Sequence, residues 1–493
     1  MNYHQKHSFL FSGKDVINIL ALVMIAWAMH FFALYFIFPG HYSPLAFHHS
    51  DFYIPASFAY ATEDGYSFAD LLNWPRPLFM WVYKFTGYFG HPGSVAWVVA
   101  VVFLNCALTA LFARRLLRLD FDRRFLLFFA LYCFLLFTQP YFYTFYSQDI
   151  GSQVSYFLLL SGMYCFLLLS ERHVYLGAVI IFVLSCCAFL VKETYILAFG
   201  FVAFCWFVFY IRSDWKKAVV PGLAIFIAGI ISILINLRSK SVFVNPDAQA
   251  GSSYHMDLSP LSIIRELARY TYEGFTPILL FVFALIIFQV HKAYKDRWIT
   301  LSAFLCLAFA CLSWLPNALL PNHHYEGYSF NGLYVSFLLL FFVAKMVQDK
   351  IDFKRTLTAL IVLVLLSPLS SIHRYEGTRN TWVLAMEQVQ TNMLAGFNRA
   401  TAQLIDRPEP IRVLVSGITS PFHPFAFPQS IRSFKGGENA IYYFIPPKDF
   451  QANLGTSIDL VHFIAEADKE NYTYDQEWKF DDQGNLVELK NLK

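Results

Sequence analysis

The sequence predicts an α-helical polytopic membrane protein that ends in a small α/β domain. Hydrophobic residues make up 57% of the chain and charged residues only 14%, whereas roughly a quarter of the residues in a soluble protein are charged. Apolar segments of about 20 residues, long enough to cross a hydrocarbon core, recur up to residue 371. After residue 371 the composition changes abruptly and strand patterns replace the apolar segments.

The apolar pattern predicts about eleven transmembrane helices. The first is too long for the core of a signal peptide, so we interpret it as a retained anchor. The predicted spans are 16–38, 94–112, 125–138, 154–170, 174–191, 194–211, 218–236, 276–290, 298–315, 331–347 and 356–371.

The distribution of Lys and Arg predicts the orientation of these helices. Basic residues are concentrated in one set of short connectors, and such clusters favour the cytoplasmic side of a membrane. This set comprises 1–15, 113–124, 171–173, 212–217, 291–297 and 345–355. The outer segments are then 39–93, 139–153, 192–193, 237–275 and 316–330. The N-terminus is expected in the cytoplasm, and the odd number of helices places everything after 371 outside.

Two domains are expected. Residues 1–371 form the transmembrane domain with its outer loops, and residues 372–493 form a soluble α/β domain. Within the second, 381–404 has helical periodicity, 412–415 and 441–445 have the pattern of buried strands, and 458–467 is a strand or a short helix. Its last segment predicts a hairpin with a turn near Gly484. The aromatic loop 421–428 is either a partner contact or a surface loop.

Composition limits the partners. A net charge of +3 is too small to indicate nucleic acid binding. All eight cysteines fall inside apolar spans, so no disulfide framework is expected. Membrane lipids are the expected surroundings.

The first outer loop carries the best candidate for a catalytic base. Asp51 follows the first span and is flanked by Phe52 and Tyr53. Partial desolvation at the lipid boundary would raise its pKa and make it a better proton acceptor. The alternative is a solvated loop acid, of which this loop has several. His49 and Arg76, in the same loop, are candidate substrate contacts together with Tyr53.

Three further charged residues stand out at outer turns. Asp149 has no basic neighbour in sequence, so it is solvated, paired across the fold or functional. Lys192 and Glu193 lie between two apolar spans with almost no loop around them. A charge at membrane depth costs about 2.5–3.5 kcal/mol on insertion scales. The pair either neutralises itself as a turn, or Lys192 faces a lipid phosphate and Glu193 holds it in place.

The middle outer loop predicts an amphipathic helix that begins after Ser259 and Pro260. Apolar residues recur there at intervals of three or four, which suits a helix on the membrane surface. Those residues are Leu261, Ile264, Ala268 and Tyr272. Arg265 in this helix, and His324 with Tyr325 in the last outer loop, are further candidate ligands for a lipid phosphate.

No metal site is predicted with the spacing of a known motif. The alternative is a divalent metal bound jointly by His48 and His49 with His323 and His324, but histidines at an interface are more often hydrogen-bonding groups.

The pattern of spans and polar residues resembles the GT-C superfamily of membrane glycosyltransferases. The shared features are Asp51 after the first span, the segment Pro75-Arg76-Pro77-Leu78 that leads into aromatics and Gly90, Asp149 in the second outer loop, and Lys192-Glu193. Protein mannosyltransferases, aminoarabinose transferases and O-antigen glucosyltransferases have a similar organisation. The chain departs from the common pattern where Phe52 replaces a second acid and where Arg76 interrupts a Pro-Pro pair.

The resemblance implies an inverting transfer of a sugar from a polyprenyl-phosphate donor, without a cofactor, in a bacterial inner membrane. Asp51 would take the proton from the acceptor hydroxyl, Lys192 with Arg265 or His324 would stabilise the phosphate, and Asp149 would orient the acceptor or sugar. The acceptor would be an envelope glycan such as lipopolysaccharide, a lipid or a protein, on the periplasmic face.

Other functions fit part of the pattern. A transporter or flippase for lipid-linked sugars would use the same lipid cavity without a base. A polymerase or ligase for O-antigen also has many spans and one large outer loop. A non-catalytic envelope protein in which Asp51 and Lys192 only pair is the third alternative.

Overall fold

The structure is a computed structural model of the full chain. It describes residues 13–37, 77–87, 90–139, 150–170, 172–192, 195–196, 198–200, 214–238, 256–323, 332–378, 381–420, 423–426, 428–447 and 454–492. The chain divides into two compact units. The first comprises Met1–Gly40, Ala100–Phe142 and Ser152–Arg374, and the second comprises His41–Val99, Tyr143–Gly151 and Tyr375–Lys493.

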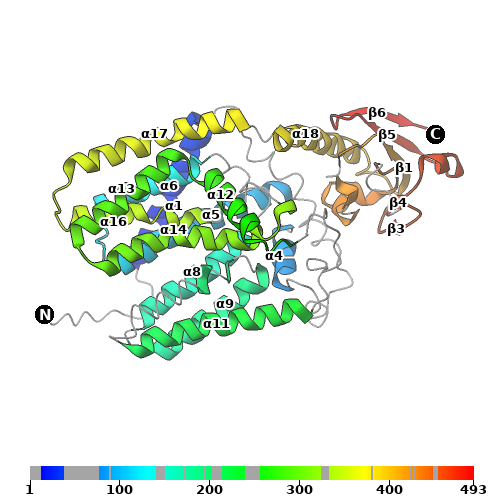
Figure 1. The fold of residues 1–493 in the computed structure, drawn as a ribbon. Coiled ribbons are helices and arrows are strands. Elements are labelled where there is room, and N and C mark those ends of the chain that lie inside the picture. Colours follow the sequence, from blue (N-terminus) through cyan, green and yellow to red (C-terminus); the bar gives the residue numbers. More distant parts are fainter. Residues whose placement is uncertain are drawn as a thin grey trace. The chain divides into compact units, whose positions relative to one another are not determined.

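Helices dominate the described part of the chain (Figure 1). They are α1 (Gly13–Phe32), which continues into the π-helical turn η1 (Ala33–Ile37), α4 (Pro77–Gly87), α5 (Gly90–Leu117), α6 (Arg123–Phe137), α8 (Ile150–Leu169), α9 (Val174–Val191), α11 (Trp215–Arg238), α12 (Pro260–Gly274), α13 (Pro277–Tyr294), α14 (Arg297–Ala318), η5 (Pro321–His323), α15 (Leu333–Ser336), α16 (Leu339–Gln348), α17 (Lys354–Thr378) and α18 (Thr381–Ala402).

Among the described residues, eight helices are long and apolar enough to cross a membrane. They are α1 with η1, α5, α8, α9, α11, α13, α14 and α17. Each coincides with one of the eleven predicted spans, as expected for a multi-pass membrane protein. Of the other three spans, 125–138 is the shorter helix α6, 194–211 lies largely outside the described residues, and 331–347 corresponds to the shorter apolar helix Leu333–Gln348.

The predicted span 331–347 forms the short apolar helix Leu333–Gln348, in which a tighter turn at Phe337 and Leu338 joins α15 to α16. The short helix α15 is held against α14, because the Ser336 hydroxyl donates to the Cys306 carbonyl at 3.0 Å. At its start, Gly332 presses on α14: a Cβ there would lie 2.6 Å from the Ala310 Cα. Only glycine allows this approach.

A methyl group at position 332 is therefore expected to destabilise the bundle. Gly332→Ala would force backbone atoms of α14 and α15 apart, which costs about 1–3 kcal/mol for overpacking. The measurement is the thermal unfolding midpoint of the purified chain in detergent. Gly200→Ala is the matched control, because a Cβ at Gly200 would meet nothing within 4 Å. Equal midpoints for the two variants would contradict the close contact.

Three of the predicted cytoplasmic connectors meet at one end of the first unit. The Gln348 side chain donates to the Arg118 carbonyl at 3.2 Å and accepts from the Asp120 amide at 3.0 Å. The Tyr294 hydroxyl donates to Asp349 at 2.8 Å. These contacts join 113–124, 291–297 and 345–355, so the three basic connectors share one side as predicted.

Neighbouring helices of the first unit are also joined by polar contacts within the apolar core. Figure 1 shows α9 and α11 side by side, and the Ser232 hydroxyl of α11 donates to the Phe189 carbonyl of α9 at 3.1 Å. Such contacts hold transmembrane helices together where lipid offers no hydrophobic driving force between them.

The C-terminal domain contains a six-stranded mixed sheet with the strand order β3-β4-β2-β1-β5-β6. The strands are β1 (Ile411–Ser416), β2 (Ala440–Phe444), β3 (Ser457–Ile458), β4 (Val461–Phe463), β5 (Gln476–Phe480) and β6 (Leu486–Asn491). The four central strands are parallel, and β3 and β6 pair antiparallel at the edges. One face packs on α18, where Phe397 stacks on Phe480 with ring centroids 5.0 Å apart.

The predicted elements of this domain are confirmed. The strands at 412–415 and 441–445 are β1 and β2, and the final hairpin is β5 and β6. Its turn contains Gly484 with φ +74°, a conformation that favours glycine. The segment 458–467 holds β4 and the start of a 3₁₀ turn rather than one continuous element.

The aromatic loop before β2 packs into the core of this domain. Phe425 is fully buried and contacts Phe397 and Phe444, and the His423 ring lies 4.9 Å from the Phe444 ring. These two side chains are therefore core residues and not a surface contact. Burial lowers the pKa of the His423 imidazole to about 3, because an apolar core disfavours the charged form.

This depressed pKa predicts acid sensitivity of the C-terminal domain. The ordinary pKa of a histidine is 6.5. Below that pH the His423 imidazole is protonated in the unfolded chain but stays neutral in the folded chain. The free energy of unfolding should thus be fully retained above pH 6.5 and fall by about 1.4 kcal/mol per pH unit as the pH drops towards 3. Hydrogen exchange of β2 peptides in the full chain measures this. His423→Phe should flatten the pH dependence between 6.5 and 4.5, and an unchanged slope would contradict the assignment.

Candidate functional site

A layer of fully buried polar side chains lies between helices of the first unit. The Asn105 amide of α5 donates to the Gln153 side chain of α8 at 3.2 Å and to its backbone carbonyl at 3.1 Å. The Tyr334 hydroxyl of α15 donates to the same Gln153 oxygen at 2.9 Å. One amide oxygen therefore joins three helices, and the short helix α15 is one of them.

A second set of contacts extends this polar layer. The hydroxyls of Thr109 and Tyr156 lie 3.0 Å apart, and the Tyr156 ring stacks on Tyr334 at 4.7 Å. Tyr132 of α6 donates to the Tyr334 carbonyl at 3.2 Å. The Gln153 amide nitrogen makes no hydrogen bond within the described part of the chain. A buried donor of this kind normally finds a partner, such as a water or a ligand group.

Lys192 lies at the end of α9, next to the start of α8. Its backbone amide closes α9 by donating to the Ala188 carbonyl at 2.9 Å. The Ser155 hydroxyl of α8 bridges the carbonyls of Ala188 and Lys192 at 3.0 and 3.1 Å. Lys192 is only 9% exposed. Lys192 is thus the C-cap residue of α9, and α8 fixes its backbone.

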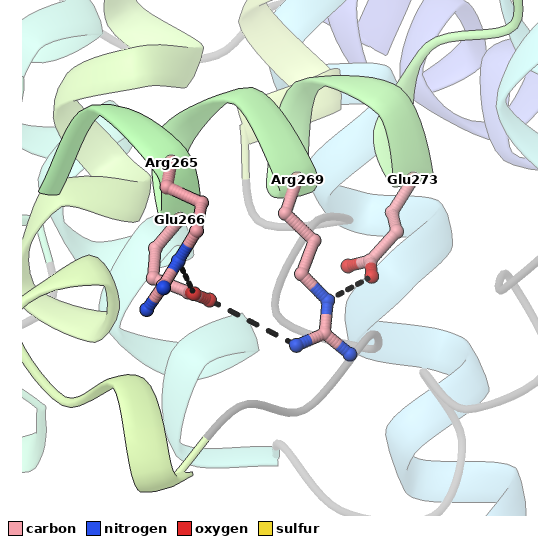
Figure 2. A network of polar contacts seen from close by, with 4 residues as sticks. All are labelled: Arg265, Glu266, Arg269 and Glu273. Atoms are coloured by element: carbon pink, nitrogen blue, oxygen red, sulfur yellow. Dashed lines mark hydrogen bonds and ion pairs between the residues drawn. The ribbon is translucent and has the colours of Figure 1, made fainter. Parts of the chain in front are cut away.

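The middle outer loop forms the predicted helix α12. Ser259 is its N-cap residue, but the Ser259 side chain makes no capping bond. The Asp257 carboxylate instead accepts from the Ser259 amide at 2.8 Å. Arg265 is exposed on α12 and its Nε contacts the Glu266 carboxylate at 3.2 Å (Figure 2).

Most of the predicted site residues lie outside the described part of the chain. This holds for Asp51, Asp149, Glu193, Arg76, His49, Tyr53, His324 and Tyr325. Their places along the chain are nevertheless informative. Asp149 immediately precedes α8, Arg76 immediately precedes α4, and Glu193 immediately follows Lys192.

No protein-family model and no curated protein matches this chain. Its function must therefore be inferred from its own residues.

The buried polar layer was missed by the sequence analysis, although a signal for it exists. Asn105 and Thr109 interrupt the apolar run of α5 four residues apart, and Gln153 opens α8. A spacing of four places Asn105 and Thr109 on one face of a helix. Polar residues inside membrane helices usually face the interior and mark functional or packing contacts.

Within the described residues, no three His, Cys, Asp or Glu side chains lie together as a metal site would require. The histidine pairs considered above have side chains outside that part of the chain. The described polar layer offers hydroxyl and amide groups, and Lys192 adds a cation at one helix end. Such a set can bind and orient a polar or anionic ligand.

Proposed function

We propose that this chain is an inverting glycosyltransferase of the membrane. It would move a sugar from a polyprenyl-phosphate donor to a cell-envelope glycan, lipid or protein on the outer face. The observation that carries the proposal is Lys192, a buried residue at a helix end whose backbone carbonyl accepts a hydrogen bond from the neighbouring helix α8. A cation kept in an apolar bundle despite its insertion cost suits an anionic lipid ligand.

The chemistry needs a positive group beside the leaving phosphate. That phosphate is already anionic, so it requires charge stabilisation more than a proton. A fixed cation in a low-dielectric site supplies this at no cost of reorganisation. In our proposal Lys192 has this role, assisted by Arg265 or by His324 and Tyr325.

The remaining roles follow from the resemblance to GT-C enzymes. Asp51 would accept the proton of the attacking hydroxyl, and Asp149 would orient the acceptor or the sugar. Glu193, Arg76, His49 and Tyr53 would contact the substrates. We also propose a bacterial inner membrane location, with the N-terminus cytoplasmic and the active site and C-terminal domain periplasmic.

A transporter or flippase for lipid-linked saccharides is the second candidate. It would use the same lipid cavity without a catalytic base. A polymerase acting on the same lipids is a further alternative.

One experiment separates these functions. The purified full chain is incubated with a panel of polyprenyl-phosphate sugars and an envelope acceptor, and the sugar that leaves the lipid is measured. Transfer of one sugar supports the enzyme. Movement of the intact lipid-linked sugar across proteoliposomes, without its cleavage, would instead support the transporter.

A further inference from the structure

Helix α12 exposes apolar residues and buries polar ones, which is the reverse of a surface helix on a soluble protein. Its outward face presents Leu261, 78% exposed, and Ile264, 63% exposed, with Tyr272 about two turns further along. Its inward face buries Ser262, Glu266, Tyr270 and Glu273. An outward apolar face is stable where the surroundings are lipid and not water.

The position of α12 places that face at the end of the membrane-spanning helices. Thr276 caps α13 directly after α12, and α13 is long and apolar enough to span a membrane. Tyr270 stacks on Trp314 near the end of α14, and the Asp257 amide donates to the Leu319 carbonyl beyond it. The helix therefore lies at the level where α13 begins and α14 ends, which is a membrane boundary.

Two arginines border the exposed apolar face on one side, as the period of the helix requires. Figure 2 shows Arg265 and Arg269 one turn apart along α12, with Glu266 and Glu273 beside them. The Nε atoms of Arg265 and Arg269 each lie 3.2 Å from a glutamate oxygen, and Arg269 also approaches Glu266 at 4.0 Å.

The arginines and the glutamates of this network differ in their exposure. The arginine side chains are 69% and 48% exposed, whereas those of Glu266 and Glu273 are 5% and 8% exposed. The acids thus lie beneath the guanidinium groups and orient them. The Glu266 and Glu273 carboxylates contact the Nε atoms of Arg265 and Arg269, and the rest of each guanidinium belongs to an exposed side chain. The surface that faces outward is positive, although the four charges sum to zero.

We propose that α12 lies in the membrane boundary and binds the phosphate headgroups of anionic phospholipids through Arg265 and Arg269. A guanidinium matches two phosphate oxygens with parallel hydrogen bonds. Leu261, Ile264 and Tyr272 lie among the acyl chains next to those headgroups. The proposal is independent of glycosyl transfer, because it concerns bulk lipids and requires no reaction.

The test is a lipid titration of the purified full chain, followed by native mass spectrometry. The probes are phosphatidylglycerol, phosphatidylcholine and polyprenyl phosphate. The central variant replaces all four charged residues by Gln (Arg265→Gln, Glu266→Gln, Arg269→Gln and Glu273→Gln). It preserves the net charge and leaves no buried acid uncompensated.

Wild-type protein is expected to prefer phosphatidylglycerol over phosphatidylcholine. Because a cation near an anionic surface contributes about fivefold in affinity, the four-Gln variant should bind phosphatidylglycerol about 25-fold more weakly, with phosphatidylcholine unchanged. Glu266→Gln with Glu273→Gln should retain the preference, since both arginines remain. Arg407→Gln with Lys435→Gln, which removes two exposed cations of the C-terminal domain, should also retain it.

Two results would overturn the proposal. One is a four-Gln variant with the thermal midpoint and the phosphatidylglycerol affinity of the wild type. The other is a variant that loses polyprenyl phosphate alone, which would assign Arg265 to the donor and not to bulk lipid.

Discussion

Asp51→Asn is expected to abolish sugar transfer while the protein remains inserted and abundant. Asn has nearly the same size as Asp but cannot accept the proton of the acceptor hydroxyl as that oxygen attacks. A positioned general base contributes about 10²–10⁴ in rate, so the loss should be at least of this order. The measurement is the initial rate of transfer by purified protein at saturating donor.

The same loop offers a matched control. Asp70→Asn removes one acid from the loop that contains Asp51, and it is expected to retain transfer. If Asp51→Asn kept full activity, Asp51 would not be the base. If both variants lost activity equally, the effect would belong to the charge of the loop and not to one carboxylate.

Lys192→Met is expected to lower transfer by about 10²–10³, the usual cost of removing one group that stabilises developing charge. Met fills a similar volume without the cation, and the backbone carbonyl that accepts from Ser155 is unchanged. Binding of polyprenyl phosphate should weaken in parallel, because the same contact exists before reaction. Lys192→Arg should recover part of both, since the charge remains while its geometry differs.

The control for this variant removes an exposed cation instead of a buried one. Lys216 is exposed at the start of α11, and Lys216→Met should leave transfer unchanged. A lower thermal midpoint of Lys192→Met with unchanged donor affinity would give Lys192 a structural role. Normal transfer by Lys192→Met would contradict its place in the site.

Sequence patterns predicted the elements whose ends are determined by residues close to them in the chain. The run of α9 ends where Lys192 interrupts the apolar residues, so both of its ends were predicted. The spacing of Leu261, Ile264 and Tyr272 predicted α12 and its exposed face, because that face depends on the period of the helix alone. The hairpin of the C-terminal domain was likewise recognisable from its turn at Gly484.

Features that depend on contacts between distant segments were not predictable in this way. Gly332 and Ser336 pack closely on α14, and nothing within 331–347 indicates that contact. The layer around Gln153 joins three helices, whereas hydropathy averages each polar residue with its apolar neighbours. For the polar loops, composition suggested candidate residues but no distances between them.

The proposed transfer requires that a lipid donor reaches the Asp51 carboxylate and the Lys192 ammonium at the same time. An experimental structure of the full chain with polyprenyl phosphate bound tests it most directly. The predicted result is a phosphate oxygen at about 2.7–2.9 Å from the Lys192 Nζ, with Asp51 lining the same cavity. A phosphate bound elsewhere, with residues 51 and 192 far apart, would contradict the account.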